Sequence, residues 1–318
     1  MKKIIVTGGS GFLGAKLSQI LTISGYEVLA IGRKKFSTLN SIRKEQLKNV
    51  IYFDSDLRND SLEKIIDYVK WDKKEIYSLF HVAWGGETGL SDLNSDEQFK
   101  NLKISLDLFK SAEKIGITKY IFTGTMEEFF AEEYLNLDHN KNTVYNRHVI
   151  YALAKLWTRR RLEIIGSKSK TDLIFITNSH VIGPGDDKDS FLQVSLSKMI
   201  HNEEINMSSG VQLFDVIDVE DCAKTYLAIL KKGKRLQHYM AGSGNPMMLK
   251  EYIYEMQTLF PAYKKLFIDK NKKADVVLDE KHFDTSNVIN DTGFEPAISF
   301  IESIKRLSVY ISEENVRY

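Results

Sequence analysis

Near its amino terminus the chain reads Thr7-Gly8-Gly9-Ser10-Gly11-Phe12-Leu13-Gly14, between an apolar, β-branched run at residues 2–6 and a segment of helical periodicity at residues 15–21. A strand, a glycine turn and a helix in this order are typical of dinucleotide binding. The glycines permit a sharp turn, close approach of a pyrophosphate to backbone N–H groups, and close packing of the helix on its strand. A glycine-rich turn without a ligand is the alternative. The contacts that this motif predicts are Gly8, Ser10, Gly11, Phe12, Leu13 and Gly14.

The turn after the second expected strand, residues 26–31, indicates which dinucleotide is bound. An NAD-binding turn usually carries Asp or Glu here, which accepts hydrogen bonds from the 2′-hydroxyl of the adenine ribose. This chain instead reads Gly32-Arg33-Lys34-Lys35, so no carboxylate repels a 2′-phosphate. Arg33, with Lys34 beside it, can pair with that phosphate, and we therefore expect NADP(H) rather than NAD(H). A solvated basic turn is the alternative.

A second motif, Tyr151-Ala152-Leu153-Ala154-Lys155, places a phenol and an ammonium four residues apart, on one face of a helix. A neighbouring ammonium favours the phenolate, and we expect it to lower the phenol pKa from its usual value near ~10. The phenol can then donate a proton to a carbonyl oxygen, which the hydroxyl of Thr125 would polarise, with Thr123 as the fallback. A packing tyrosine beside a solvated lysine is the alternative. Together the two motifs predict a redox enzyme that acts on a carbonyl or an alcohol.

These features resemble the extended short-chain dehydrogenase/reductases, a family of nucleotide-sugar epimerases, dehydratases and reductases, over nearly the whole chain. The resemblance implies catalytic roles for Asn101, Thr125, Tyr151 and Lys155. It also implies a loop, Gly183-Pro184-Gly185, that closes over the nicotinamide. The further cofactor contacts that it implies are Asp56, Leu57, Ala83, Thr123, Tyr151, Lys155, His180 and Val181. Two further motifs of the family, which occur late in its sequences and are called late landmarks here, correspond to Val219-Glu220-Asp221 and Gly242-Ser243-Gly244.

Two departures from the family pattern bear on the reaction. Met126 stands where 4,6-dehydratases carry the Asp of Thr-Asp-Glu, and a thioether cannot serve as a general acid. Phe214 stands where relatives often carry an Arg that grips the nucleotide diphosphate, with Lys188, Lys272 and Lys273 as candidate replacements. A pair of exposed glutamates is the alternative for Glu127 and Glu128, and a structural role is the alternative for each histidine. The candidate substrate contacts are Trp84, Glu127, His180, Lys188 and Asp215.

We therefore expect NADPH-dependent reduction of a keto group, at C4, on a nucleotide-activated sugar. An epimerase or dehydratase that retains NAD is the alternative, which Arg33 and Met126 disfavour. A regulator that binds NADP(H) without turnover is the non-enzymatic alternative, since a fold alone does not prove catalysis.

The composition is that of an ordinary folded enzyme. With 43% hydrophobic residues, the 318-residue chain can bury a substantial core. A net charge of +1 gives no electrostatic reason to expect nucleic acid or a membrane as a partner. Cys222 is the only cysteine and no Cys/His spacing indicates a metal, so we expect no metal site. A reducing cytoplasm, without a cleavable leader, is the expected location.

The alternation of strands and helices predicts an α/β fold, a Rossmann-type doubly wound parallel sheet. The expected strands are residues 3–7, 27–31, 50–53, 77–82, 118–123 and 172–178. The dinucleotide-binding domain should comprise residues 1–179 plus about 211–239. A smaller, discontinuous C-terminal substrate domain should comprise about 180–210 plus 240–318.

If the chain follows its relatives, it forms a homodimer through two helices, residues 97–115 and 151–165. The second helix carries Arg159-Arg160-Arg161. This run either forms ion pairs across the interface or is solvated.

Overall fold

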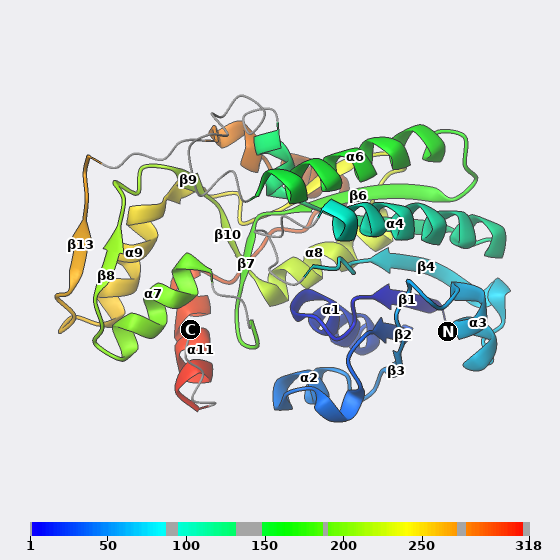
Figure 1. The fold of residues 1–318 in the computed structure, drawn as a ribbon, viewed down its shortest axis with the longest axis horizontal. Helices are drawn as coiled ribbons and strands as arrows, with labels where there is room; N and C mark the ends of the chain where they lie inside the picture. Colours follow the sequence, from blue (N-terminus) through cyan, green and yellow to red (C-terminus); the bar gives the residue numbers. More distant parts are fainter. Residues whose placement is uncertain (1, 87–94, 132–147, 187–189, 272–277, 314–318) are drawn as a thin grey trace.

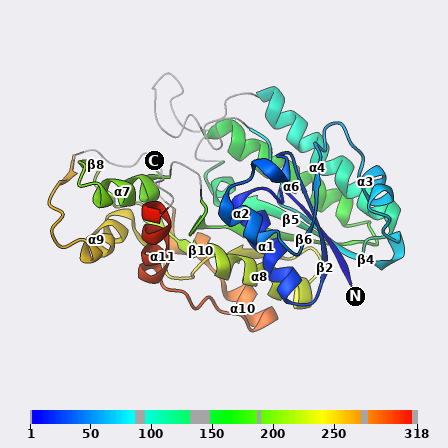
Figure 2. The same cartoon turned by 90° about the horizontal axis from the view of Figure 1, so that it is seen from below.

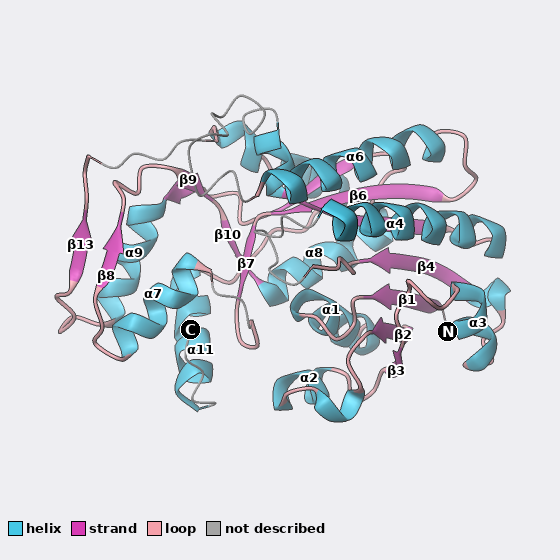
Figure 3. Ribbon diagram, in the orientation of Figure 1, coloured by secondary structure: helices cyan, strands magenta, loops and turns pink. Residues whose placement is uncertain are grey.

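The computed structural model describes residues 2–86, 95–131, 148–186, 190–271 and 278–313. Its largest sheet has seven strands, all paired in parallel, in the order β11-β6-β5-β4-β1-β2-β3 (Figure 1 and Figure 3). The strands are β1 (Lys3–Thr7), β2 (Glu27–Gly32), β3 (Ile51–Asp54), β4 (Ile76–His81), β5 (Lys119–Thr125), β6 (Asp172–Asn178) and β11 (His238–Ala241).

Helices cover both faces of this sheet, because its strands are apolar on both sides. In β1, Ile4 and Val6 belong to one hydrophobic cluster and Ile5 to the other. Residues of α1, α8 and α10 fill the first cluster, and residues of α3, α4 and α6 fill the second (Figure 2). These helices are α1 (Phe12–Ile23), α3 (Leu62–Tyr68), α4 (Ser95–Ile115), α6 (Val149–Gly166), α8 (Val219–Lys232) and α10 (Ser286–Thr292). The predicted doubly wound fold is confirmed.

Shorter elements connect the strands. The short helix α2 (Ser41–Gln46) lies between β2 and β3. The chain also forms 3₁₀ turns η1 (Phe36–Thr38), η2 (Lys73–Glu75), η4 (Met126–Phe130) and η6 (Glu280–Phe283). Of these, η4 directly follows β5 and therefore begins at the carboxyl edge of the sheet, where ligands of such folds bind.

A third hydrophobic cluster lies beside the sheet and is built from the later part of the chain (Figure 2). Its helices are α7 (Phe191–Ile200), α9 (Leu249–Leu259) and α11 (Phe300–Glu313). Three small two-stranded sheets accompany them: β7 (His180–Ile182) with β10 (Val216–Asp218), β9 (Leu213–Phe214) with β12 (Met247–Met248), and β8 (Ile205–Met207) with β13 (Leu266–Ile268). The domain boundaries given above stay a prediction.

The late landmark Val219-Glu220-Asp221 opens α8 and holds the carboxyl-terminal segment. The Asp221 carboxylate accepts hydrogen bonds from the backbone N–H groups of Ala297, at 2.7 Å, and Ile298, at 2.6 Å. Arg306 on α11 donates to Glu220 at 3.1 Å. None of the described helices is long and apolar enough to cross a membrane.

Candidate active site

The glycine turn is closed by its own backbone. Gly11 N–H donates to Gly8 O at 2.8 Å, and Gly9 N–H donates to Ile31 O of β2 at 2.9 Å. Gly8 has a φ of +76°, which favours glycine. A Cβ on Gly14 would lie 2.2 Å from Gly8 O, so the first turn of α1 presses on the glycine loop. Gly11 precedes α1 and has no side chain to cap it, which leaves the first N–H groups of the helix to an anion such as a pyrophosphate.

The basic turn lies beside the glycine turn and is tied to it. Arg33 and Lys34 are exposed after β2. The hydroxyl of Tyr52 donates to the carbonyl oxygen of Lys34 and is also hydrogen-bonded to Ser10. Tyr52 therefore ties the backbone of the basic turn to the glycine turn. These residues fit a phosphorylated dinucleotide, since the turn supplies backbone donors and the neighbouring loop supplies cations.

Asp56, one of the predicted cofactor contacts, lies near the same turn. Arg58 donates from Nε to Asp56 Oδ1 at 3.0 Å and also pairs with Glu97 on α4, at 3.2 Å. The bond from Arg58, and the more distant charge of Arg33, lower the pKa of the Asp56 carboxyl. Asp56 is thus held as an anion, chiefly by the Arg58 guanidinium.

The structure brings Thr125, Tyr151 and Lys155 together at the carboxyl end of β5. The Tyr151 hydroxyl is hydrogen-bonded to the Thr125 side chain. Lys155, buried one turn further along α6, donates from Nζ to the carbonyl oxygen of Thr123 at 2.9 Å. Trp84 completes the cluster, because its ring meets the Tyr151 ring edge-on at 6.3 Å and lies 4.0 Å from Lys155 Nζ.

The electrostatics of Tyr151 differ from the prediction. Burial raises the pKa of its phenol well above the usual value, the negative charges of Glu127 and Glu128 raise it further, and the bond to Thr125 only partly offsets them. The expectation that Lys155 lowers this pKa is wrong for the structure described, since the ammonium is turned toward the Thr123 carbonyl and the Trp84 ring. A phenol that keeps its proton is a proton donor at neutral pH.

Asn101 holds the loop that carries Trp84. Its side chain accepts from Gly85 N–H at 2.8 Å and donates to Gly85 O at 2.7 Å, while Trp84 Nε1 donates to Gln98 at 2.8 Å. Asn101 therefore acts on the cluster through the loop backbone. The remainder of the Trp84 loop, and Lys188, Lys272 and Lys273, lie outside the described residues.

His81 is buried and held by hydrogen bonds on both ring nitrogens, which indicates a structural role. Its Nδ1 lies 2.9 Å from Thr7 Oγ1 and its Nε2 lies 2.8 Å from Ser105 Oγ. Burial lowers the pKa of His81 to about 3, with a smaller contribution from the charge of Lys155, so the ring is neutral at physiological pH.

Asp215 also lies in a structural environment. It is fully buried, and its carboxylate accepts hydrogen bonds from the hydroxyl and, at 2.9 Å, the backbone N–H of Ser243. Burial raises the pKa of the Asp215 carboxyl. His180, the other candidate from this region, packs edge-on against Phe214 at 5.7 Å. We therefore give Asp215 a structural role and leave His180 as a candidate.

The alternative of two exposed glutamates is wrong. Glu127 and Glu128 are both buried in η4. His148, which precedes α6, lies 3.5 Å from Glu127, and Arg159 lies 2.5 Å from Glu128. The arginine run is therefore not simply solvated, since Arg159 is held inside this chain.

The sequence did not predict three residues that lie near the site. The Tyr226 hydroxyl lies 3.1 Å from Thr123 Oγ1 and 2.9 Å from Asn178 Oδ1, beneath the cluster. Arg43 of α2 donates to the carbonyl oxygen of Gly185, which fastens the 183–185 loop to α2. Tyr52 is the third. Each occupies an ordinary position in an amphipathic pattern, so no local signal distinguishes it.

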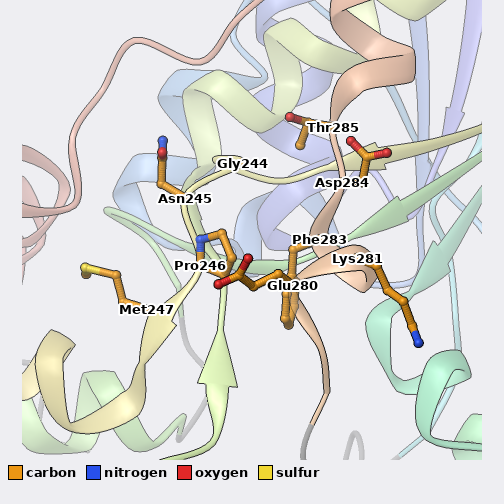
Figure 4. Close-up of a pocket in the computed structure, with 9 residues that line it drawn as sticks. All are labelled: Gly244, Asn245, Pro246, Met247, Glu280, Lys281, Phe283, Asp284 and Thr285. Atoms are coloured by element: carbon orange, nitrogen blue, oxygen red, sulfur yellow. The ribbon is translucent and has the colours of Figure 1, made fainter.

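A hollow of about 530 Å³ opens between the loop after β11 and the segment that leads into α10 (Figure 4). It adjoins β12, which pairs with the strand that contains Phe214. No residue of the Tyr151 cluster lines it. The lining residues are Gly244, Asn245, Pro246, Met247, Glu280, Lys281, Phe283, Asp284 and Thr285.

Several known proteins with similar sequences are nucleotide-sugar enzymes. CDP-abequose synthase from Salmonella typhimurium is 27% identical over 276 residues, which cover 83% of this chain and 83% of the relative. The dTDP-D-glucose 4,6-dehydratase of Homo sapiens is 21% identical over 318 residues, which cover 96% of this chain and 88% of the relative.

Solved structures agree on the fold. UDP-glucuronic acid 4-epimerase from Bacillus cereus, in complex with NAD, matches with a TM-score of 0.78 at 17% identity, over 99% of this chain and 100% of that chain. At this identity the likeness shows the fold alone. The model of the family described as "NAD dependent epimerase/dehydratase family" matches residues 4–242. Because that match spans most of the chain, the protein belongs to the NAD dependent epimerase/dehydratase family.

Proposed function

We propose that the protein is an NADPH-dependent reductase of a keto group, at C4, on a nucleotide-linked sugar. The observation that carries this proposal is the half-buried Tyr151 phenol, hydrogen-bonded to Thr125 and packed against Trp84, which keeps its proton at neutral pH and can give it to a carbonyl oxygen. The similarity to CDP-abequose synthase of Salmonella typhimurium supports a nucleotide-linked sugar as the substrate class.

Each residue of the cluster has its own role in the proposed reaction. The glycine turn, Arg33 and Lys155 would hold the dinucleotide, whose nicotinamide supplies the hydride when bound. Tyr151 donates its proton to the carbonyl oxygen, and Thr125 donates a hydrogen bond to the same oxygen as negative charge develops there. Lys155, whose ammonium donates to the Thr123 carbonyl and lies over the Trp84 ring, holds these two parts of the cluster together.

An epimerase or dehydratase that retains NAD is the second candidate. The similarity to human dTDP-D-glucose 4,6-dehydratase favours it. Met126, which stands at the position of the dehydratase Asp, and Arg33, which suits a 2′-phosphate, favour reduction. A regulator without turnover is the third, and the assembled Tyr151 cluster speaks against it.

The nucleotide content of the purified protein separates these candidates. Protein that arrives empty and binds NADPH much more tightly than NADH supports a reductase, because a reductase must exchange its cofactor in every cycle. Protein that is purified with tightly bound oxidised NAD would instead favour an epimerase or dehydratase over a reductase. A screen of nucleotide-linked keto-sugars, followed by NADPH absorbance, then tests the substrate class.

Replacing Arg33 by Ala should lower the preference for NADPH over NADH by about tenfold or more, because a charge-assisted, bidentate contact to the 2′-phosphate is lost. Dissociation constants of both cofactors, measured by fluorescence titration, give the preference. Lys35→Ala, in the same exposed turn, is the control and should change it less. An unchanged preference in Arg33→Ala would identify the basic turn as solvated surface.

We also propose a homodimer built on α4 and α6, in a reducing cytoplasm that fits the single, buried Cys222. Phe99 and Trp157 are 55% and 58% exposed, and their rings meet edge-on at 6.1 Å across the two helices. Ile164, further along α6, is exposed as well. Three large apolar side chains on one helix pair are typical of a protein interface.

Trp157→Glu tests this interface. The variant should be monomeric at concentrations where the parent is dimeric, because a carboxylate buried without a partner disfavours association. Light scattering coupled to size-exclusion chromatography measures the mass. Ile23→Glu, at an exposed apolar residue of α1, is the matched control and should leave the mass unchanged. A parent that is monomeric, or a Trp157→Glu variant that stays dimeric, would contradict the assignment.

A further inference from the structure

One buried carboxylate joins the two elements that carry the catalytic hydroxyls. Glu128 Oε1 accepts a hydrogen bond from the backbone N–H of Thr125 at 3.1 Å. Its Oε2 accepts from Arg159 Nε, on α6, at 2.5 Å. Glu128 thus bridges the end of β5, which carries Thr125, to the helix that carries Tyr151.

Both partners of the bridge are enclosed. The Glu128 side chain is 1% exposed and the Arg159 side chain is 11% exposed. The carboxylate packs over Gly124, where a Cβ would lie 2.6 Å from Glu128 Oε1. Gly124 therefore provides the space in which the carboxylate reaches the Thr125 backbone. A buried ion pair of this kind needs good geometry, because each charge has lost its hydration.

Arg159 lies on the same face of α6 as the catalytic side chains. Tyr151, Lys155 and Arg159 are four residues apart in succession, which places them one above another along the helix. Glu163, one turn further, accepts from Arg159 Nη1 at 2.9 Å. The guanidinium is therefore fixed on both sides, by one carboxylate beside the active site and another on its own helix.

We propose that Glu128 and Arg159 are positioning residues, which hold Thr125 in register with Tyr151 and balance the charge beside the phenol. This proposal rests on the proposed function of Tyr151 as the proton donor. Neither residue needs to touch the substrate, since both act through the placement and the ionisation of the catalytic hydroxyls. A small misplacement of reacting groups is enough to cost a large factor in rate.

The charges around Tyr151 determine whether each variant raises or lowers the pKa of the phenol. Glu127 and Glu128 face the phenol from η4 and both raise its pKa. Lys155 and Arg159 lie on its own helix, and His148, just before α6, lies beside Glu127. Without Arg159, the Glu128 carboxylate is uncompensated, so the phenol pKa should rise. Without Glu128, one source of negative charge is lost, so the phenol pKa should fall.

Arg159→Gln and the double variant Glu128→Gln/Arg159→Gln test the proposal. We expect Arg159→Gln to lower turnover about tenfold or more. We also expect the alkaline limb of its reductive pH profile, where Tyr151 loses its proton, to move upward, because the Glu128 carboxylate then has no cationic partner. The double variant removes both charges, so its alkaline limb should return to the position of the parent. Arg160→Gln, an exposed neighbour that also pairs with Glu163, is the matched control and should change neither quantity.

A second readout needs no substrate. The ionisation of Tyr151 is measured as the difference in ultraviolet absorbance between each protein and its Tyr151→Phe counterpart during alkaline titration. If no keto-sugar is reduced, the proposed function fails, while this titration still tests the charge balance. Arg159→Lys, which keeps the charge but loses the fixed fork, should keep the titration of the parent and lose turnover.

The opposite results overturn the proposal. They are an Arg159→Gln variant with the turnover and titration of the parent, or a double variant whose titration stays with that of Arg159→Gln. Melting temperatures identify a variant that has lost its fold, and Arg159→Lys then replaces it as the test of positioning.

Discussion

Replacing Tyr151 by Phe is expected to lower turnover of the keto substrate by a factor of about 10² or more and to leave cofactor affinity little changed. The variant keeps the ring, and therefore its edge-on contact with Trp84, but it lacks the hydroxyl that is bonded to Thr125. The carbonyl oxygen then loses its proton donor while the dinucleotide keeps its own contacts. Steady-state kinetics and fluorescence titration with NADPH measure the two quantities.

Tyr239→Phe is the control for this experiment. Tyr239 likewise has a hydrogen-bonded hydroxyl, 2.8 Å from Asp291, but it is fully buried and lies on β11 at the far edge of the sheet. Its variant should keep the turnover of the parent. A Tyr151→Phe variant with unaltered turnover would rule out the assignment of the proton donor.

Replacing Gly14 by Ala should weaken the binding of both NADPH and NADH by about 100-fold. The added Cβ would lie 2.2 Å from Gly8 O and 2.8 Å from Gly8 C. Both atoms are backbone, so the clash is relieved only if the glycine turn opens. An opened turn no longer directs its N–H groups at a pyrophosphate. Fluorescence titration of both cofactors measures the loss.

Gly25→Ala is the matched control for Gly14→Ala. Gly25 follows the other end of α1, has a φ of +86°, and has open space around a built Cβ. Its variant should lower the melting temperature through backbone strain and leave cofactor affinity unchanged. Equal affinity in Gly14→Ala and the parent would show that the turn does not cradle a pyrophosphate.

The sequence predicted the sheet well because its strands are marked by apolar runs between turn residues. Six strands of the large sheet agree with the prediction. The seventh, β11, was missed, since His238–Ala241 is short and leads directly into glycines. The strand β10, at residues 216–218, pairs with β7 in a separate two-stranded sheet, a pairing that the sequence did not indicate. Pairing of such short strands is decided by tertiary packing, which periodicity does not reveal.

The sequence predicted the site residues that belong to local motifs, but not the contacts between residues that are distant in the chain. The Tyr151 and Lys155 pair, and the nearby Thr125, came from local spacing and resemblance, and the structure brings them together. The bridge from Glu128 to Arg159 spans 31 residues and the contact of Tyr226 with Thr123 spans 103, so neither leaves a local pattern. The direction of the Tyr151 pKa was also missed, because burial depends on the folded surroundings.

The fate of the hydride tests the central claim most directly. The protein is supplied with a nucleotide-linked 4-keto sugar and with NADPH that carries deuterium at the transferable position of the nicotinamide. We predict that one NADPH is oxidised for each sugar converted and that the deuterium is found at C4 of the product. Conversion of a nucleotide sugar without net oxidation of NADPH, and with no deuterium in the product, would contradict the account.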